Sequence, residues 1–105
     1  SNADMYLSIH INNLDDKSYS GAQVFYLKDN MNLAESIQRQ LNTITYPRSI
    51  KKMPDVYMYE KLKIRGVLIE CGFISNYEER EKLQNIEHQK NLASHITKGI
   101  IDYYK

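Results

Sequence analysis

Two apolar segments of the chain each carry a side chain that can take part in catalysis. Near the N-terminus Met5–Ile11 contains His10, and later Gly66–Cys71 contains Glu70. Apolar runs of this kind predict two buried strands. An imidazole and a carboxylate at the ends of neighbouring strands are groups from which zinc hydrolase sites are built. A catalytic zinc takes about three protein ligands, and the chain does not obviously supply two more.

The other residues with metal-binding or nucleophilic side chains do not complete such a site. His88 and His95 fall on a predicted helix, roughly 10 Å apart along its axis. One zinc with bonds of ~2 Å cannot reach both, so each is expected at the surface or packed on the helix. Cys71, the only cysteine, is expected to be a small buried hydrophobe that points away from Glu70. On the residues alone, His10 also fits a core histidine at a strand end, and both interpretations stay open.

Length and charge limit the classes of protein to which the chain can belong. Its 105 residues suffice for one domain at most. A net charge of +1 argues against nucleic-acid binding, which needs a clustered basic face. The doublet Lys51-Lys52 is expected to be a solvated loop, and no apolar run approaches the roughly 20 residues that span a bilayer. Ser1-Asn2-Ala3 is typical of a tag-removal scar, so residues 4–105 are expected to form the domain.

The pattern of apolar residues predicts strands and helices in a definite order. Strands are expected at Met5–Ile11, Gln23–Leu27, Val56–Tyr59 and Gly66–Cys71. Helices are expected from Asn30 or Asn32 through Leu41, after a cap at Ser75 or Asn76, and over Glu87–Tyr104. The order β-β-α-β-β-α-α predicts an α/β fold in which a mixed β-sheet is flanked by helices.

Six segments, in their order along the chain, resemble one enzyme family. They are Asp4–Asn12, Ser20–Tyr26, Leu33–Gln38, Val56–Met58, Val67–Asn76 and the helix Gln89–Ile100. Together they are similar to the second half of the zinc-dependent N-acetylmuramoyl-L-alanine amidases. The stretch Ser-Gly-Ala-Gln-Val-Phe-Tyr at Ser20–Tyr26 is most similar to the sporulation and germination branch, which acts on spore-cortex peptidoglycan. The resemblance covers Asp4 to Lys105.

The resemblance implies roles for two residues. His10 matches a zinc ligand of the family, and Glu70 matches the catalytic glutamate that acts on the zinc-bound water. The reaction implied is hydrolysis of the amide between N-acetylmuramic acid and L-alanine of peptidoglycan, in which zinc polarises the carbonyl and the carboxylate carries the proton. Asn12, on the same face as His10 if the strand is regular, is a candidate for orienting His10 or the substrate. Tyr46, like Tyr19 in a loop, is a candidate for contact with the substrate.

The chain also departs from the family pattern. The family's first zinc histidine and its ligand glutamate belong to strands and helices that precede this stretch. The chain therefore resembles the C-terminal half of the catalytic domain, truncated by the first strands and helices. We expect the intact enzyme to use zinc, and this stretch alone to bind none stably and to be inactive. The resemblance also implies an extracytoplasmic location, in the cell wall or spore cortex.

Further expectations concern partners and competing functions. Without preceding strands, Met5–Ile11 becomes an unprotected sheet edge beside apolar surface, which predicts a homo-oligomer. Peptidoglycan is the expected substrate, and a regulatory protein partner is left open. The competing interpretations are a non-catalytic peptidoglycan-binding or regulatory module with the same fold, and an unrelated small α/β domain. A His-Gly-Gly-like turn and a glutamate upstream in the parent protein would favour the enzyme.

Overall fold

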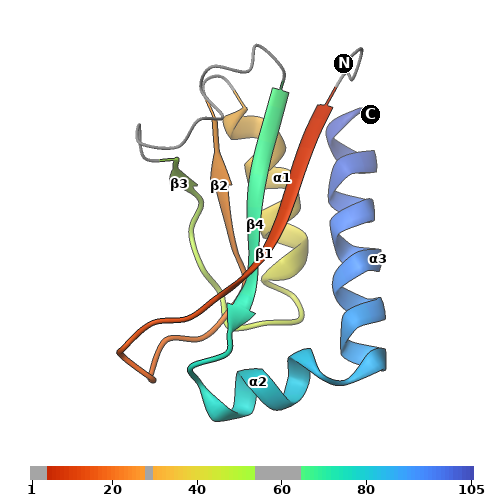
Figure 1. Cartoon of the computed structure of the whole chain (residues 1–105). Helices are drawn as coiled ribbons and strands as arrows, with labels where there is room; N and C mark the ends of the chain where they lie inside the picture. Colours follow the sequence, from red (N-terminus) through yellow and green to blue (C-terminus); the bar gives the residue numbers. More distant parts are fainter. Residues whose placement is uncertain (1–4, 28–29, 54–64) are drawn as a thin grey trace.

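The computed structural model describes residues 5–27, 30–53 and 65–105 of the chain. Its described elements run in the order β-β-α-β-β-α-α, although the third strand is not the one that the sequence predicted (Figure 1). They are β1 (Met5–Asn12), β2 (Gln23–Tyr26), α1 (Met31–Leu41), β3 (Lys51–Lys52), β4 (Arg65–Phe73), α2 (Tyr77–Leu83) and α3 (Ile86–Tyr103). A mixed sheet flanked by helices confirms the predicted α/β fold class.

One mixed sheet joins the described strands in the order β1-β4-β2-β3. Strand β4 lies between β1, to which it is parallel, and β2, to which it is antiparallel, while β3 pairs in parallel with β2. The apolar run Gly66–Cys71 thus has ladder partners on both sides. Its neighbouring side chains Leu68 and Ile69 point to opposite faces and are both buried, as expected for a strand covered on both faces. Strand β1 pairs only with β4 among the described strands, so Met5–Ile11 forms the predicted edge of this part of the sheet.

The short strand β3 differs from the prediction. Lys51-Lys52 is expected from its charge to be a solvated loop, yet it pairs with Phe25 and Tyr26 of β2. The Met53 N–H then donates to the Tyr26 carbonyl at 2.8 Å. The loop prediction is wrong because strand pairing uses the backbone, whereas both lysine side chains stay exposed, as is common at sheet edges. The expected strand Val56–Tyr59 lies outside the described residues.

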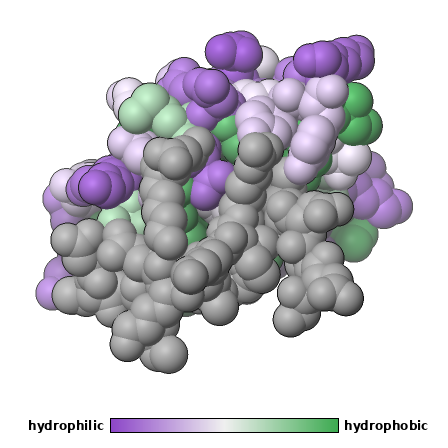
Figure 2. Space-filling view, turned by 90° about the horizontal axis from the view of Figure 1, so that it is seen from above, coloured by the Kyte–Doolittle hydropathy of each residue, from purple (hydrophilic) through white to green (hydrophobic). Residues whose placement is uncertain are grey.

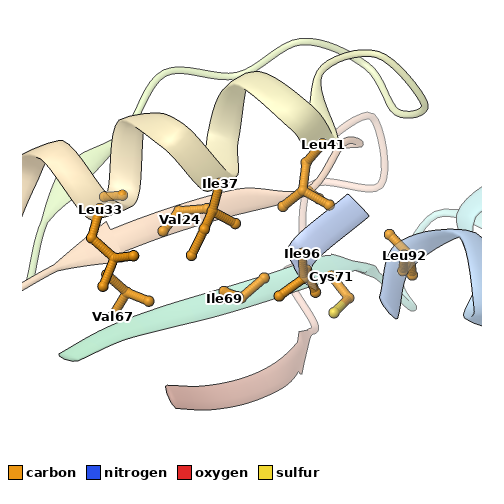
Figure 3. Close-up of a cluster of buried hydrophobic side chains, with 11 residues drawn as sticks. Val24, Leu33, Ile37, Leu41, Val67, Ile69, Cys71, Leu92 and Ile96 are labelled. Carbon is orange, nitrogen blue, oxygen red and sulfur yellow. The ribbon is translucent and has the colours of Figure 1, made fainter. Parts of the chain in front are cut away.

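Helices α1 and α3 lie side by side and cover one face of the sheet (Figure 1). Because side chains alternate along a strand, Val24 of β2 and Val67 and Ile69 of β4 all point toward these helices. The apolar face of α1 predicted from three- and four-residue spacing meets them, as Figure 3 shows. The buried core consists of Ala22, Val24, Leu33, Ala34, Ile37, Leu41, Val67, Ile69, Cys71, Leu92 and Ile96.

The close approach of α1 and α3 depends on Gly99. A Cβ atom added there would lie 2.6 Å from the Cα of Ile37, so any other residue would push the helices apart. The Ser36 hydroxyl donates to the Gly99 carbonyl at 2.6 Å across the same contact. This packing holds α3 where its Leu92 and Ile96 side chains join Cys71 in the core (Figure 3).

An open apolar groove lies between β1 and α3. Ile9 and Ile11 line it from β1, and Leu92, Ala93 and Ile96 line it from α3, around a volume of about 240 Å³. Ile9 is 57% exposed and Ile11 is 53% exposed. The helix-facing side of β1 therefore lacks the cover that α1 provides for β2 and β4.

Helices α1 and α3 each bury one stripe of residues, whereas α2 buries only Glu79. Helix α3, with 18 residues, buries only Leu92, Ile96 and Gly99. No helix in the described ranges combines the length and the apolar character needed to cross a membrane. Figure 2, which views the molecule from the end opposite α2, shows hydrophilic side chains over much of the coloured surface, with smaller apolar patches between them.

Candidate active site

His10 and Glu70 are brought together by the pairing of β1 with β4. They are partners in the parallel ladder, although about sixty residues separate them in the sequence. Ile69 and Cys71, on either side of Glu70, belong to the core under the helices, so Glu70 points to the opposite face. Both strands end just beyond this pair, near α2 in Figure 1. The carboxyl ends of parallel strands are a common location of sites in α/β proteins, and the pair occupies a face that none of the described helices covers.

Glu70 is partly buried and incompletely hydrogen-bonded. Its Oε2 atom is buried and has no hydrogen-bond partner among the residues that the structure describes. Burial raises the pKa of this carboxyl group above its ordinary value, and nearby His10 opposes part of the rise. Buried oxygens without a donor are rare, and a raised pKa is typical of a carboxyl group that exchanges protons in a site. Both properties fit a general acid–base with one oxygen left for a ligand.

His10 is exposed at the edge of the sheet. Its Nε2 atom lies 2.8 Å from the Ser8 hydroxyl oxygen, two residues earlier on β1. An imidazole in this position offers one metal ligand beside the Glu70 carboxylate. Within the described ranges, however, no three or more His, Cys, Asp or Glu side chains are grouped so that they could hold a metal ion. These residues fit part of a zinc site, which needs about three protein ligands, and not a whole one.

The other two histidines belong to α3. Burial and then Lys82 lower the pKa of His88, while Glu79 acts in the opposite direction. The Nδ1 atom of His95 lies 2.8 Å from the Asn91 carbonyl oxygen, one turn earlier on the same helix. Both histidines are partly buried on α3, as expected for histidines that pack on the helix.

Cys71 points toward the helices, on the face opposite Glu70, as predicted. Burial, with the Glu70 charge as a second cause, raises the pKa of its thiol to about 11. The nucleophilic form of cysteine is the thiolate, which is scarce at neutral pH for such a group. Cys71 is therefore a packing residue.

Asn12 lies just beyond an irregularity in β1. The register with β4 shifts between His10 and Asn12, so the regular alternation that would place both side chains on one face is interrupted. The Asn12 Oδ1 atom accepts from the Asn13 N–H, and its carbonyl accepts from the Ile74 N–H, each at 2.8 Å. Asn12 thus ties the ends of β1 and β4 together beside the pair.

Tyr46 is 68% exposed and lines an open hollow. The hollow has a volume of about 420 Å³ and is lined by Ser18, Tyr19, Ser20, Tyr46 and Arg48. The two loop tyrosines singled out in the sequence, Tyr19 and Tyr46, therefore share one surface.

Arg48 also lines this hollow, and the sequence did not single it out as a site residue. Its guanidinium lies 5.7 Å from the ring centroid of Tyr19 and 5.6 Å from that of Phe73. It donates to the Ser20 carbonyl at 2.9 Å and to Gln23 Oε1 at 3.3 Å. These partners come from separate parts of the chain, so no local pattern could have indicated them.

Glu79 braces the end of the sheet at which the pair lies. Its Oε1 atom accepts from the Gly21 N–H at 2.7 Å and from the Phe73 N–H at 3.4 Å, and the residue is only 6% exposed. Asn76 caps α2 by accepting from the Glu79 N–H at 3.1 Å, which selects it over Ser75 as the predicted cap. The link between Glu79 and Gly21 joins residues 58 positions apart and depends on the tertiary fold.

Removing the Glu70 carboxylate should change how stability depends on pH. Because its pKa is raised in the folded state, the native chain holds this proton more tightly than the unfolded chain does. Stability therefore falls as the pH rises from the ordinary carboxyl value of 4.5 through the raised pKa.

The variant Glu70→Gln lacks this titration. Its free energy of unfolding should therefore rise relative to that of the unsubstituted chain as the pH increases. Urea unfolding from about pH 4 to about pH 8 measures the difference. Glu35→Gln, at an exposed position of α1, controls for the loss of one negative charge. A difference between Glu70→Gln and the unsubstituted chain that stays constant over this range would contradict the expectation.

Residues 1–102 match the Amidase_3 family, described as N-acetylmuramoyl-L-alanine amidase. The germination-specific N-acetylmuramoyl-L-alanine amidase of Bacillus subtilis (strain 168) is 37% identical over 109 residues, which cover 99% of this chain and 46% of that protein. The N-acetylmuramoyl-L-alanine amidase LytC of the same organism is 33% identical, with 98% of this chain and 22% of LytC covered. The chain thus spans about half or less of the length of these curated relatives.

Solved structures agree with the sequence comparisons. The CwlD amidase of Clostridioides difficile, solved in complex with the GerS lipoprotein, superposes with a TM-score of 0.92 at 39% identity, covering 99% of this chain and 56% of that one. The amidase AmiC2 of Nostoc punctiforme gives a TM-score of 0.87 at 27% identity, covering 98% of this chain and 59% of that one. The family match over residues 1–102 and these superpositions show that the chain belongs to the N-acetylmuramoyl-L-alanine amidase family.

Proposed function

We propose that the protein of which this chain is part hydrolyses the amide between N-acetylmuramic acid and L-alanine in peptidoglycan. The observation that carries the proposal is the in-register pair of His10 and Glu70, where Glu70 keeps a buried oxygen without a described donor. Membership of the amidase family supports the substrate class.

Glu70 carries the proton in the proposed reaction. Its raised pKa suits a carboxylate that takes a proton from the attacking water and then passes it to the leaving nitrogen. The nitrogen of an amide is a poor leaving group, so it must gain a proton as the carbon–nitrogen bond breaks.

We assign His10 as one ligand of a zinc ion in the intact protein. When bound, zinc polarises the amide carbonyl and lowers the pKa of its water toward ~7. Among the described contacts, the exposed imidazole at the β1 edge has one hydrogen-bond partner, the Ser8 hydroxyl. The remaining ligands must come from outside the described residues, because these contain no group of three potential ligands.

Asn12 and Tyr46 are proposed to position the substrate. Asn12 follows His10 at the end of β1, where the strand register shifts. Tyr46 exposes most of its ring beside the hollow on the β2 side of the sheet. In this arrangement Asn12 orients groups near His10, and Tyr46 packs against the more distant part of the bound substrate.

We further propose that residues 4–105 form the C-terminal half of the catalytic domain, preceded by a tag scar at residues 1–3. The chain spans 46% of the Bacillus subtilis relative and 56% of the Clostridioides difficile one. The groove beside β1 exposes Ile9 and Ile11, which a further part of the domain would cover. The chain alone is then expected to hold no zinc stably and to be inactive.

The test compares the intact protein with the chain alone on purified peptidoglycan. Cleavage is measured as new N-terminal L-alanine by mass spectrometry, and zinc by elemental analysis after dialysis against trace zinc. We expect cleavage and about one zinc per molecule for the intact protein, and neither for the chain alone. Peptidoglycan binding by the intact protein without new L-alanine termini would contradict the proposal and favour a non-catalytic binding or regulatory module.

An extracytoplasmic location in the cell wall or spore cortex is part of the same proposal, because the substrate lies there. Relatives of the chain are named for germination and for the cell wall. The Clostridioides difficile relative was solved with a lipoprotein, and a regulatory partner of the present protein would have to reach the same location.

The isolated chain is expected to self-associate through β1. This strand is a sheet edge with apolar side chains exposed beside it, and such edges pair with other chains. Light scattering at micromolar concentrations should therefore show dimers or larger assemblies. Ile9→Lys should favour the monomer because a charge beside the edge opposes pairing. Ile101→Lys, at a 53% exposed position of α3, is the matched control. A monomeric unsubstituted chain at every concentration would count against this expectation.

A further inference from the structure

Arg48 is a partly buried cation held in one arrangement at the wall of the hollow. Its guanidinium lies against the rings of Tyr19 and Phe73 and donates to the Ser20 carbonyl and to Gln23 Oε1. A guanidinium carries five N–H donors, so the two described bonds leave others for a ligand in the hollow. Rings and hydrogen bonds together fix the side chain before any ligand arrives, which lowers the entropic penalty of binding.

Arg48 forms no ion pair within the described ranges. The one ion pair found there joins Lys105 to Asp102 at the far end of α3. The described partners of the Arg48 guanidinium are two aromatic rings, a backbone carbonyl and a side-chain amide, all uncharged. Because Arg48 is partly buried and lines the hollow, an anionic ligand there would supply the charged partner that the guanidinium lacks.

The hollow adjoins Glu70 through Gln23. Gln23 and Glu70 are directly opposite each other in the antiparallel ladder of β2 and β4. Residues opposite each other in such a ladder share a face, with Cα atoms roughly 5 Å apart. Gln23 accepts from Arg48, and its Nε2 atom donates to the Ser49 carbonyl at 2.8 Å. His10, Glu70, Gln23 and Arg48 therefore follow one another across the sheet.

We propose that Arg48 binds a carboxylate of the peptide that follows the scissile amide. This inference rests on the proposed amidase function. The N-acetylated glycan has no charge once the carboxyl group of muramic acid forms the amide, whereas the peptide carries carboxylates. A planar guanidinium binds a carboxylate through two parallel hydrogen bonds. The peptide therefore extends from Glu70 across β2 toward Arg48, and the glycan lies on the β1 side.

Two muramyl dipeptides test this assignment on the chain itself. Both are N-acetylmuramoyl-L-alanyl-D-glutamate with the γ-carboxyl group amidated, and one of them also carries an amide in place of the α-carboxylate. Isothermal titration calorimetry should show that the carboxylate ligand binds at least about tenfold more tightly than the amide ligand. The measurement needs no turnover, so its failure is distinguishable from a failure of the intact protein to hydrolyse peptidoglycan.

Variants of Arg48 and Lys51 test whether Arg48 is the residue that causes the preference for the carboxylate ligand. Arg48→Gln should bind both ligands equally, and Arg48→Lys should keep only a small part of the preference because an ammonium group lacks the planar fork. Lys51→Gln removes an equal charge from an exposed position of β3 and should keep the full preference. Circular dichroism checks that each variant folds, and the ligand comparison on the unsubstituted chain stands without them. Equal affinities for that chain, no binding of either ligand, or a preference that survives in folded Arg48→Gln would each overturn the assignment.

Discussion

Glu70→Gln in the intact protein should lower kcat for cleavage of peptidoglycan by about 10²–10⁴-fold, the usual contribution of a general acid–base. The amide keeps the size and shape of the carboxyl group but cannot take a proton from water and return it to the leaving nitrogen. The expected loss is large because Glu70 is the only carboxylate that the described residues place beside His10 in the strand register. Release of N-terminal L-alanine over time measures the effect.

Two controls separate this effect from damage to the fold or to the zinc site. Glu35→Gln removes an exposed carboxylate from α1 and should leave kcat unchanged. Zinc content should be similar in Glu70→Gln and in the unsubstituted intact protein, because His10 and not Glu70 is the proposed ligand. Cleavage by Glu70→Gln at more than about a tenth of the normal rate would remove Glu70 from its proposed role.

Glu79→Ala should lower the free energy of unfolding of the chain by about 3 kcal/mol, since a buried N–H that loses its acceptor costs roughly 1–3 kcal/mol. The Glu79 carboxylate accepts from the Gly21 and Phe73 N–H groups. Gly72 packs against the same carboxylate, because a Cβ atom added there would lie 3.1 Å from Glu79 Oε1. Urea unfolding at neutral pH measures the loss.

Two neighbouring variants calibrate this expectation. Glu79→Gln keeps an accepting oxygen and should lose about 1 kcal/mol. Glu78→Ala removes an exposed carboxylate from the first turn of α2, where its effect through the helix dipole is about 0.3–1 kcal/mol. If Glu79→Ala unfolds no more easily than Glu78→Ala, the carboxylate does not brace the sheet as described.

Periodicity accounts for most of what the sequence predicted about the fold. The three- and four-residue spacing of Leu33, Ile37 and Leu41 indicated α1, and all of these side chains are fully buried. The continuous apolar run of β4 indicated a strand covered on both faces, and its side chains Ile69 and Leu68, which point to opposite faces, are both buried. Such patterns are informative because burial of apolar side chains drives both elements to form. The strand at Lys51-Lys52 was not predicted, because only its backbone pairs with β2 and its exposed side chains show no apolar pattern.

The candidate site was predicted only in part, for a related reason. His10 and Glu70 were recognisable because each interrupts an apolar strand with a reactive side chain, and because the surrounding segments resemble one family. Arg48 and Glu79 act on backbone groups of distant loops, the Ser20 carbonyl and the Gly21 N–H. Contacts of this kind depend on which loops lie side by side in the folded chain, and the spacing of residues in the sequence does not predict this.

The arrangement of strands also sets the order in which the protein can fold. β1 and β2 come early in the chain but do not pair with each other; each pairs with β4, the last of the described strands. Pairing β1 with β4 closes a loop of about sixty residues, and such long-range closure is slow and entropically unfavourable. On the ribosome, the sheet cannot assemble until synthesis has passed Phe73. The proposed proton carrier therefore meets His10 only when most of the chain has been made, so shorter nascent chains lack the pair on which catalysis would depend.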